Sequence, residues 1–378
     1  MDFSPSSEQQ ALKDSLRRLL DRDLDFEARR ILVRADEGAF RDLWTKLADL
    51  GCLGAGLGED LGGFGGDASD MAMIAQELGR TLAPLPYTAH VMGLALLSRA
   101  PSPDPEFLAR IAAGERCVMP ALLEPGARGD LSQVATMAVR QGDHFEISGM
   151  KSQVEGVGLA DDLLVSARVE PDGAVALFLV DVATAGISKT PYRTVANTRV
   201  SEIEFHRVTV PASACLDPDA SALIATAEDF GIVMTCAQSL GAMDAALWLT
   251  RDYLRNRKQF GQPLASFQAL QHRMADMLIE TELARSMLFQ ALAALDASDP
   301  TVRRRGVSAA KVQNAEAGMF VGGQAIQLHG AIGMTEEYVL AHLYKLLFAN
   351  ARQFGGPDLH LERFIAAGDG PAAEVGRS

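Results

Sequence analysis

The spacing of the apolar residues changes twice along the chain, and this feature restricts the possible fold most strongly. In the first 115 or so residues, apolar side chains recur at helical spacing. From about Val118 to Val208 the spacing becomes two residues, in short runs that Gly and Asp separate as hairpin turns require. After Pro211 the spacing is helical again. The pattern predicts helices, then a β domain, then a helical bundle.

The predicted elements follow these runs. Helices are expected from Ser7 and over 40–50, 68–78 and 88–98, and strands over 118–123, 134–139, 144–147, 163–167, 176–180 and 201–205. Four longer helices are expected over about 222–258, 267–297, 302–328 and 336–352. We therefore predict an α+β multidomain fold. It has an N-terminal helical domain over 1–117, a middle antiparallel β domain over 118–215 and a C-terminal four-helix bundle over 216–378.

The composition is that of an ordinary globular protein, with 48% hydrophobic and 22% charged residues. Because 35 Lys and Arg face 49 Asp and Glu, the net charge is −14, and neither nucleic acid nor an anionic membrane surface is an expected partner. The four cysteines are far apart in the sequence, which argues against a zinc site or a disulfide framework. With no signal-peptide pattern at Met1, these features predict a cytoplasmic protein.

Two segments suggest functions that their surroundings do not support. The stretch 231–249 approaches the length of a membrane span, but basic residues follow it in the same helical phase, so a buried bundle helix is predicted without membrane insertion. It is also too apolar to face water, which predicts a tetramer.

The segment 51–66 is rich in glycine, but no strand precedes it and no GK[ST] follows, as a phosphate-binding loop would require. A turn-rich connector is therefore predicted there.

Two segments in the last third of the chain carry a family resemblance. The first is YLRNRKQFGQPL over 253–264, followed by Phe267 and Gln268, and the second is AIQLHGAIGMTEEY over 325–338. Weaker matches are LEPGARGD over 123–130 and ISGMK over 147–151. In this order and architecture, nearly the whole chain resembles the acyl-CoA dehydrogenase family. The resemblance implies dehydrogenation of an acyl-CoA thioester, in which a glutamate removes the α-proton and the FAD cofactor takes the β-hydride.

In that family the flavin crosses a subunit boundary, and this chain resembles the part that binds the ADP end. The matching positions are Arg257, Gln259, Phe260, Phe267, Gln268, Gln327, Leu328, His329, Gly330 and Ala331. By resemblance, Arg257 binds the pyrophosphate, where a planar guanidinium suits phosphate oxygens. For an isolated arginine a solvated helix end would be the simpler interpretation, but the motif that follows favours the binding role.

The positions that hold the flavin ring in the family are changed here. Leu123 and Gly129 replace a threonine and a serine, and Gln153 and Glu155 replace a tryptophan and a threonine. By resemblance, Glu155 would bring negative charge towards a ring that gains charge on reduction, which opposes the requirement of such a site.

The catalytic base is also missing, so no catalytic residue is predicted in this chain. Phe354 occupies the place of the family glutamate, and Gly231 occupies an alternative place on the first bundle helix. Glu228 is close to the second place, but with Asp229 it is interpreted as a solvated charge near a helix N-terminus.

The positions for the flavin ring and the base are changed, whereas those for the ADP end are retained. This combination favours the first of three hypotheses. In the first, the chain is a partner subunit in an α2β2 acyl-CoA dehydrogenase, similar to the small, non-catalytic subunits of paired bacterial enzymes such as pimeloyl-CoA dehydrogenase. A catalytic subunit would then supply the base and the ring site, and electron-transfer flavoprotein would accept the electrons. The second hypothesis is a homotetrameric flavoenzyme with an unrecognised base, and the third is a scaffold protein that binds no flavin.

Overall fold

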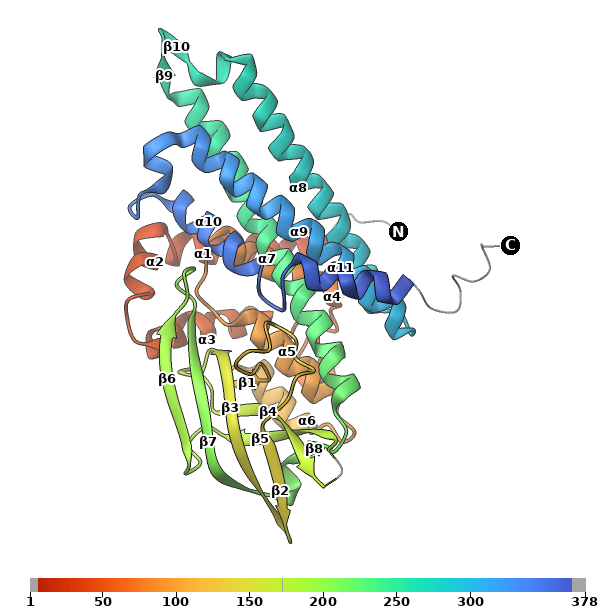
Figure 1. The fold of residues 1–378 in the computed structure, drawn as a ribbon. Helices are drawn as coiled ribbons and strands as arrows, with labels where there is room; N and C mark the ends of the chain where they lie inside the picture. The colour runs from red at the N-terminus through yellow and green to blue at the C-terminus, as the bar shows by residue number, and fades with distance from the viewer. Residues whose placement is uncertain (1–5, 172, 369–378) are drawn as a thin grey trace, which may run out of the picture. The chain divides into compact units, whose positions relative to one another are not determined.

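The computed structural model describes residues 6–171 and 173–368 (Figure 1). The chain divides into two compact units. The first unit comprises Met1–Arg29, Ala72–Ala83 and Ile232–Ser378, and the second comprises Arg30–Met71 and Pro84–Gly231. Three helices continue across the boundaries: α2 (Phe26–Leu32), α4 (Ala68–Arg80) and α7 (Ser221–Asn256). Each unit is described separately below.

The first unit is helical. Besides α2, α4 and α7 it contains α1 (Ser7–Asp23), α8 (Gln268–Leu295), α9 (Pro300–His329), α10 (Val339–Asn350) and α11 (Pro357–Gly368). The small hairpin of β9 (Lys258–Gln259) and β10 (Gln262–Pro263) connects α7 to α8, and the 3₁₀ turns η5 (Leu264–Ser266) and η6 (Gly330–Met334) complete the unit. The four predicted bundle helices are therefore confirmed, and α11 follows them.

Helix α4 packs very closely against α7 inside this unit. A methyl group on Gly79 would lie 2.0 Å from the backbone oxygen of Gln238, and one on Gly241 would lie 1.9 Å from that of Gln76. Real side chains do not approach backbone atoms so closely, so each glycine allows the partner helix to pass. The pair fixes where the two helices cross.

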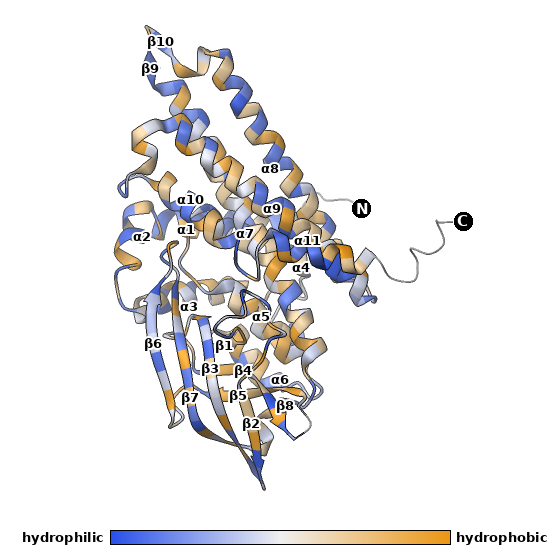
Figure 2. Cartoon of the chain, viewed as in Figure 1, coloured by the Kyte–Doolittle hydropathy of each residue, from blue (hydrophilic) through white to orange (hydrophobic). Residues whose placement is uncertain are grey.

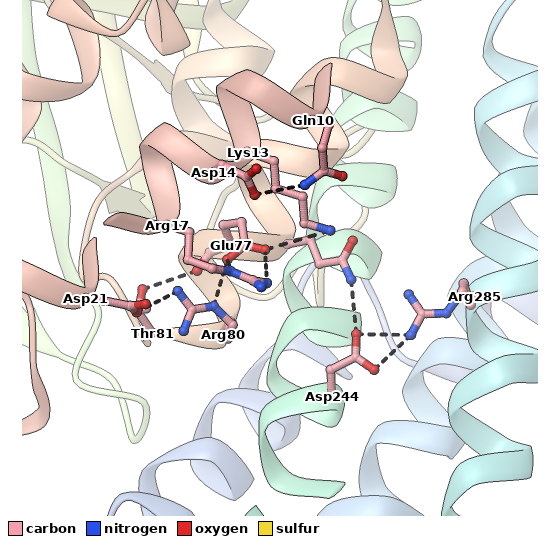
Figure 3. Close-up of polar contacts among 11 residues, drawn as sticks. Gln10, Lys13, Asp14, Arg17, Asp21, Glu77, Arg80, Thr81, Asp244 and Arg285 are labelled. Atoms are coloured by element: carbon pink, nitrogen blue, oxygen red, sulfur yellow. Dashed lines mark hydrogen bonds and ion pairs between the residues drawn. The ribbon is translucent and has the colours of Figure 1, made fainter. Parts of the chain in front are cut away.

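Ion pairs connect four helices of the same unit (Figure 3). Glu77 on α4 is 2% exposed, and its carboxylate accepts hydrogen bonds from Arg17 on α1 at 2.6 and 3.2 Å and from Arg80 at 2.7 Å. On α7, Asp244 accepts from Gln76 of α4 at 3.1 Å and from Arg285 of α8 at 2.8 and 3.0 Å. Since a buried carboxylate is costly unless paired, these contacts bind α1 and α4 to the bundle.

The second unit is built on a sheet of eight strands. They are β1 (Val118–Ala121), β2 (Met137–Gln141), β3 (His144–Glu155), β4 (Asp162–Glu170), β5 (Val175–Asp181), β6 (Ile187–Arg193), β7 (Arg199–Pro211) and β8 (Cys215–Asp217). The order is β6-β7-β3-β2-β4-β5-β8, and β1 pairs with β4. The helices α3 (Arg41–Asp49), α5 (Tyr87–Ser98) and α6 (Pro105–Ala112) belong to the same unit, as do the 3₁₀ turns η1 (Glu37–Phe40), η2 (Cys52–Gly54), η3 (Glu59–Leu61) and η4 (Ala212–Ala214).

The helix–sheet–helix order that the sequence predicts is confirmed, but the sheet is mixed instead of purely antiparallel. β1 and β2 both run parallel to β4, whereas the pairs β2–β3, β3–β7, β6–β7, β4–β5 and β5–β8 are antiparallel. The glycine-rich segment 51–66 forms η2, η3 and turns, as predicted for a connector.

Helix α7 contains the apolar stretch that approaches membrane length. Among the described residues it is the one helix long and apolar enough to cross a bilayer, but 72% of its apolar window is buried in the protein. A buried core helix accounts for this, as the sequence predicts. The argument for a tetramer that rests on 231–249 facing water is therefore wrong, because the chain buries most of this stretch itself.

Candidate functional site

The first motif forms the end of α7 and the hairpin that follows it. The amide of Arg257 donates to the Tyr253 carbonyl at 2.8 Å, and the Arg257 carbonyl accepts from Leu264 at 2.8 Å, which closes the hairpin. Phe260 and Gly261 form its two-residue turn, with φ of +53° and +80°. Positive φ at both central residues matches the twist of a tight hairpin, although it is unfavourable for phenylalanine.

The side chains of this hairpin point away from the protein. Arg257 and Gln259 are exposed, and the Phe260 ring is 89% exposed at the tip. Phe267 contacts Phe260 edge to face, with ring centroids 6.0 Å apart, and Gln268 is exposed in the first turn of α8. A large aromatic side chain is rarely left so open, so this tip is suited to contact with another molecule.

The second motif forms the end of α9 and η6. Gln327, Gly330 and Ala331 are exposed, whereas Leu328 and His329 are buried. Gly330 ends the helix at a φ of +65°. The two motifs are in contact, since the His329 ring stacks on Tyr253 with centroids 4.2 Å apart and the Tyr253 hydroxyl donates to the His329 carbonyl at 3.3 Å. The structure thus brings together two segments that are over 60 residues apart in the sequence.

This surface of the first unit could hold a nucleotide diphosphate. Arg255, Arg257 and Lys258 are all exposed and provide positive charge for phosphate oxygens. The Gln259 and Gln327 amides are exposed donors and acceptors for hydroxyl groups. In the same turn, the buried Nε2 of His329 has no hydrogen-bond partner among the described residues. The donor set fits the ADP half of FAD.

In the second unit, the weaker motifs form a buried ion pair that the sequence does not predict. The Lys151 ammonium, fully buried, donates to Glu124 at 2.6 Å and to the Ser166 hydroxyl at 2.9 Å. Burial lowers the pKa of Lys151 to about 8, and although desolvation opposes it, the lysine charge and hydrogen bonds lower the pKa of Glu124. Glu124 also accepts from the amides of Ala135 and Thr136, so the pair holds β3 to the loop before β2.

The positions that match the flavin-ring site of the family carry other side chains here. Gln153 lies in a β-bulge of β3 with a φ of +54°, and its amide donates to Glu202 at 3.3 Å. Tyr192 donates to the same carboxylate at 2.6 Å, and burial together with this bond raises the pKa of Tyr192 to about 12. Leu123 accepts from Ser152 through its backbone, Gly129 has a φ of +91°, and Glu155 is half-buried. No indole or threonine hydroxyl is present at these positions, so they do not fit the ring half of FAD.

Phe354 lies in the turn between α10 and α11, with a φ of +59°. Its carbonyl accepts from Nε2 of His360 at 2.9 Å, and its half-buried side chain has no group that accepts a proton. Gly231 is buried within α7. The prediction for Glu228 and Asp229 is wrong: they are 3% and 1% exposed, because the helix around them is buried and does not face solvent.

No metal centre accompanies these groups in the part of the chain that the structure describes, where no three His, Cys, Asp or Glu side chains are clustered as ligands. His272 is exposed on α8, and all four cysteines are free thiols.

Comparison with known proteins agrees with this architecture. Three family models match: the acyl-CoA dehydrogenase N-terminal domain over residues 6–115, the middle domain over 120–208 and the C-terminal domain over 224–367. A curated relative, the probable acyl-CoA dehydrogenase YngJ of Bacillus subtilis, is 29% identical over 97% of this chain and 99% of its own.

Two solved structures are similar over the same extent. The steroid ACAD Tcur3481-Tcur3483 variant has a TM-score of 0.88 and 30% identity, covering 97% of this chain and 99% of that one. The ChsE4-ChsE5 complex of Mycobacterium tuberculosis has a TM-score of 0.86 and 26% identity, covering 100% of both chains. With all three domains matched in order, the chain belongs to the acyl-CoA dehydrogenase family of FAD-dependent oxidoreductases.

Proposed function

We propose that this chain is the partner subunit of an α2β2 acyl-CoA dehydrogenase, donating the ADP-end half of an FAD site to a catalytic subunit. Its three domains would be those expected from the sequence, over 1–117, 118–215 and 216–378. The catalytic subunit supplies the base and the ring half, acyl-CoA is the substrate, and electron-transfer flavoprotein receives the electrons in the cytoplasm.

One observation carries this proposal. The hairpin between α7 and α8 extends Arg257 and Gln259 outward and leaves Phe260 89% exposed. A group of binding side chains that faces away from its own chain is suited to a site completed by another chain.

The changed positions support the same division of roles. Phe354 and Gly231 cannot remove a proton, and Gln153 and Glu155 replace the indole and hydroxyl of the family's ring site. Two similar structures also bear names that pair two proteins, Tcur3481-Tcur3483 and the ChsE4-ChsE5 complex.

The residues would divide the work as follows. Bound FAD supplies the hydride acceptor for the reaction. Arg257 binds the diphosphate with a forked, charge-assisted contact, and Gln259 and Gln327 orient the nucleotide through their amides. Phe260, Phe267 and Gln268 would help to hold it at the hairpin, and the turn of Leu328, His329, Gly330 and Ala331 would hold its adenosine part.

Helix α8 provides a surface for subunit assembly. Leu278, Ile279 and Leu283 are 41%, 56% and 47% exposed, and Ile279 and Leu283 are four residues apart on one side of the helix. Apolar side chains at this spacing form a stripe that is stabilised when another helix covers it. This surface replaces the stretch 231–249 as the basis for an expected tetramer.

A homotetrameric enzyme with an unusual base is the second candidate, and the buried Glu228 favours it. A carboxylate that is 3% exposed, three residues before Gly231, is placed as a shifted base would be. Substitution of Glu228 by Gln tests this candidate, since it abolishes any flavin-dependent turnover by the chain alone only if Glu228 is the base.

The experiment for the main proposal compares Arg257→Ala with Arg251→Ala in the co-purified complex. Both arginines are exposed at the end of the same helix, but Arg251 pairs with Asp252 at 2.8 Å and stacks on Trp248. Losing a charged phosphate contact costs about 1.5–3 kcal/mol, roughly tenfold to a hundredfold in affinity. Arg257→Ala should therefore lower the FAD content while Arg251→Ala retains it, with the tetramer mass intact in both. Equal FAD in the two variants would contradict the role of Arg257.

A further inference from the structure

The His329 ring is buried, but only one of its nitrogens has a partner. His329 is 4% exposed, and its Nδ1 lies 2.9 Å from the Ala325 carbonyl oxygen. Because a carbonyl only accepts, the neutral ring carries its proton on Nδ1 and presents a lone pair at Nε2. Nε2 is buried and has no hydrogen-bond partner among the described residues.

Two tyrosines enclose this ring. Tyr253, near the end of α7, stacks on it at 4.2 Å with planes 25° apart, and Tyr338, which precedes α10, is tilted against it at 5.4 Å. Since Tyr253 also donates to the His329 carbonyl, the stack connects the ends of α7 and α9 and the start of α10. It therefore holds the turn over 327–334 in place.

We propose that the Tyr253–His329–Tyr338 stack is a protonation-sensitive latch. The neutral imidazole keeps the turn over 327–334 closed and able to bind the ADP end of FAD, and the imidazolium opens it. This inference rests on the proposed function, because that function assigns the turn to FAD. His329 is thus a positioning residue for flavin binding.

The direction of the effect follows from burial. A proton on Nε2 would create a charged donor where no acceptor is available, and burial accordingly lowers the pKa of His329 below its ordinary 6.5. The titratable groups that face the ring are the Tyr253 and Tyr338 phenols, and no charged group among the described residues acts on it. The closed turn is fully stable above about pH 6.5 and is lost as the pH falls below that value.

Hydrogen exchange on the full chain tests the latch without requiring flavin. His329→Phe retains a stacking ring that cannot be protonated, and His329→Ala removes the ring. Comparing variants at the same pH cancels the intrinsic exchange rate. In the wild type, protection of 327–334 should fall by up to about tenfold in total between pH 7.5 and 5.5, relative to His329→Phe, with the loss below about pH 6.5. The Ala variant should be unprotected at both values, and a variant of the exposed His206, His206→Phe, should behave as wild type.

Two results would overturn the latch. One is an identical pH response in the wild type and His329→Phe, and the other is loss of protection in His329→Phe at pH 7.5 equal to that in His329→Ala. NMR titration of the wild-type chain measures the pKa of His329 directly. It does not require any variant to remain folded at low pH. The His329 ring resonance is assigned by its absence from the His329→Phe spectrum at pH 7.5, and a pKa at or above 6.5 would also overturn the proposal.

The FAD content of the co-purified complex tests the coupling to flavin. It should fall from pH 7.5 to 5.5 in the wild type and remain constant in His329→Phe. If the turn opens while FAD content stays constant, the coupling is wrong. If the complex holds no FAD at either pH, the proposed function fails, and the exchange experiment still decides the latch.

Discussion

Phe354 occupies a turn that side chains from three helices hold in place. On α11, His360 donates from Nε2 to the Phe354 carbonyl at 2.9 Å. Lys311 of α9 donates to the Asn350 carbonyl, and Thr235 of α7 donates to the Gln353 side chain at 3.4 Å. The turn is therefore well supported although it carries no base. The Phe354 side chain cannot accept a proton, and the contacts around it hold the turn in place.

His360 makes the stability of this turn dependent on pH. It is fully buried, and burial together with nearby cations lowers its pKa to about 3. The unfolded chain binds a proton near pH 6.5, so the stabilisation is complete above that value and declines as the pH falls towards about 3. The slope is about 1.4 kcal/mol per pH unit for one such group. Urea unfolding at pH 7, 6 and 5 should show a slope reduced by about this amount in His360→Gln and an unchanged slope in the control His206→Gln.

The sequence points to some segments of the candidate site, but it does not indicate how other residues are buried or paired. The segment 253–264 is recognisable because its residue types recur at fixed positions, and the structure places it on an exposed hairpin. The burial of Glu228 and Asp229 is a tertiary effect, since a charged pair early in a helix is usually solvated. The Lys151–Glu124 pair joins residues 27 positions apart in the chain, and no local pattern indicates that they meet.

Among the elements, the long bundle helices could be predicted most closely, whereas the short helices α2 and α6 were not predicted. A 36-residue helix such as α7 carries a long periodic signal, and all four bundle helices appear within a few residues of their expected bounds. Strand β6 was not predicted, because its residues are mostly exposed and hydrophilic and show no alternation (Figure 2). The parallel pairing of β1 and β2 with β4 depends on chain connections that residue patterns do not reveal.

The crossing of α4 and α7 provides a prediction at this scale. Gly241→Ala places a methyl group 1.9 Å from the Gln76 oxygen, so the helices must separate, at a cost of about 1–3 kcal/mol or more. Gly323→Ala on α9 is the control, since no atom lies within 4 Å of its new methyl group. That change should stabilise the helix by about 0.5–1 kcal/mol. Thermal unfolding that shifts equally in both variants would contradict the account of the crossing.

In the molecule as a whole, residues distant in sequence build one unit. The first unit combines Met1–Arg29, Ala72–Ala83 and the chain from Ile232 onward, and the Arg17–Glu77 ion pair and the hydrogen bond from Gln76 to Asp244 join these segments. The second unit contains the positions that would meet a flavin ring, and the first contains those that would meet the ADP end. If, as proposed, the chain binds the ADP end and does not bind the ring, it completes a flavin site only with a partner of its own family.

Counting flavin in the assembled complex tests this claim most directly. The chain should be co-expressed with a family member that retains the base and the ring residues, and the tetramer isolated and weighed. FAD is then released and measured against protein. The account predicts one FAD per pair of unlike chains, and thus two per tetramer, with dehydrogenase activity in the complex and none in this chain alone. Four FAD per tetramer, or flavin-dependent turnover by this chain alone, would contradict it.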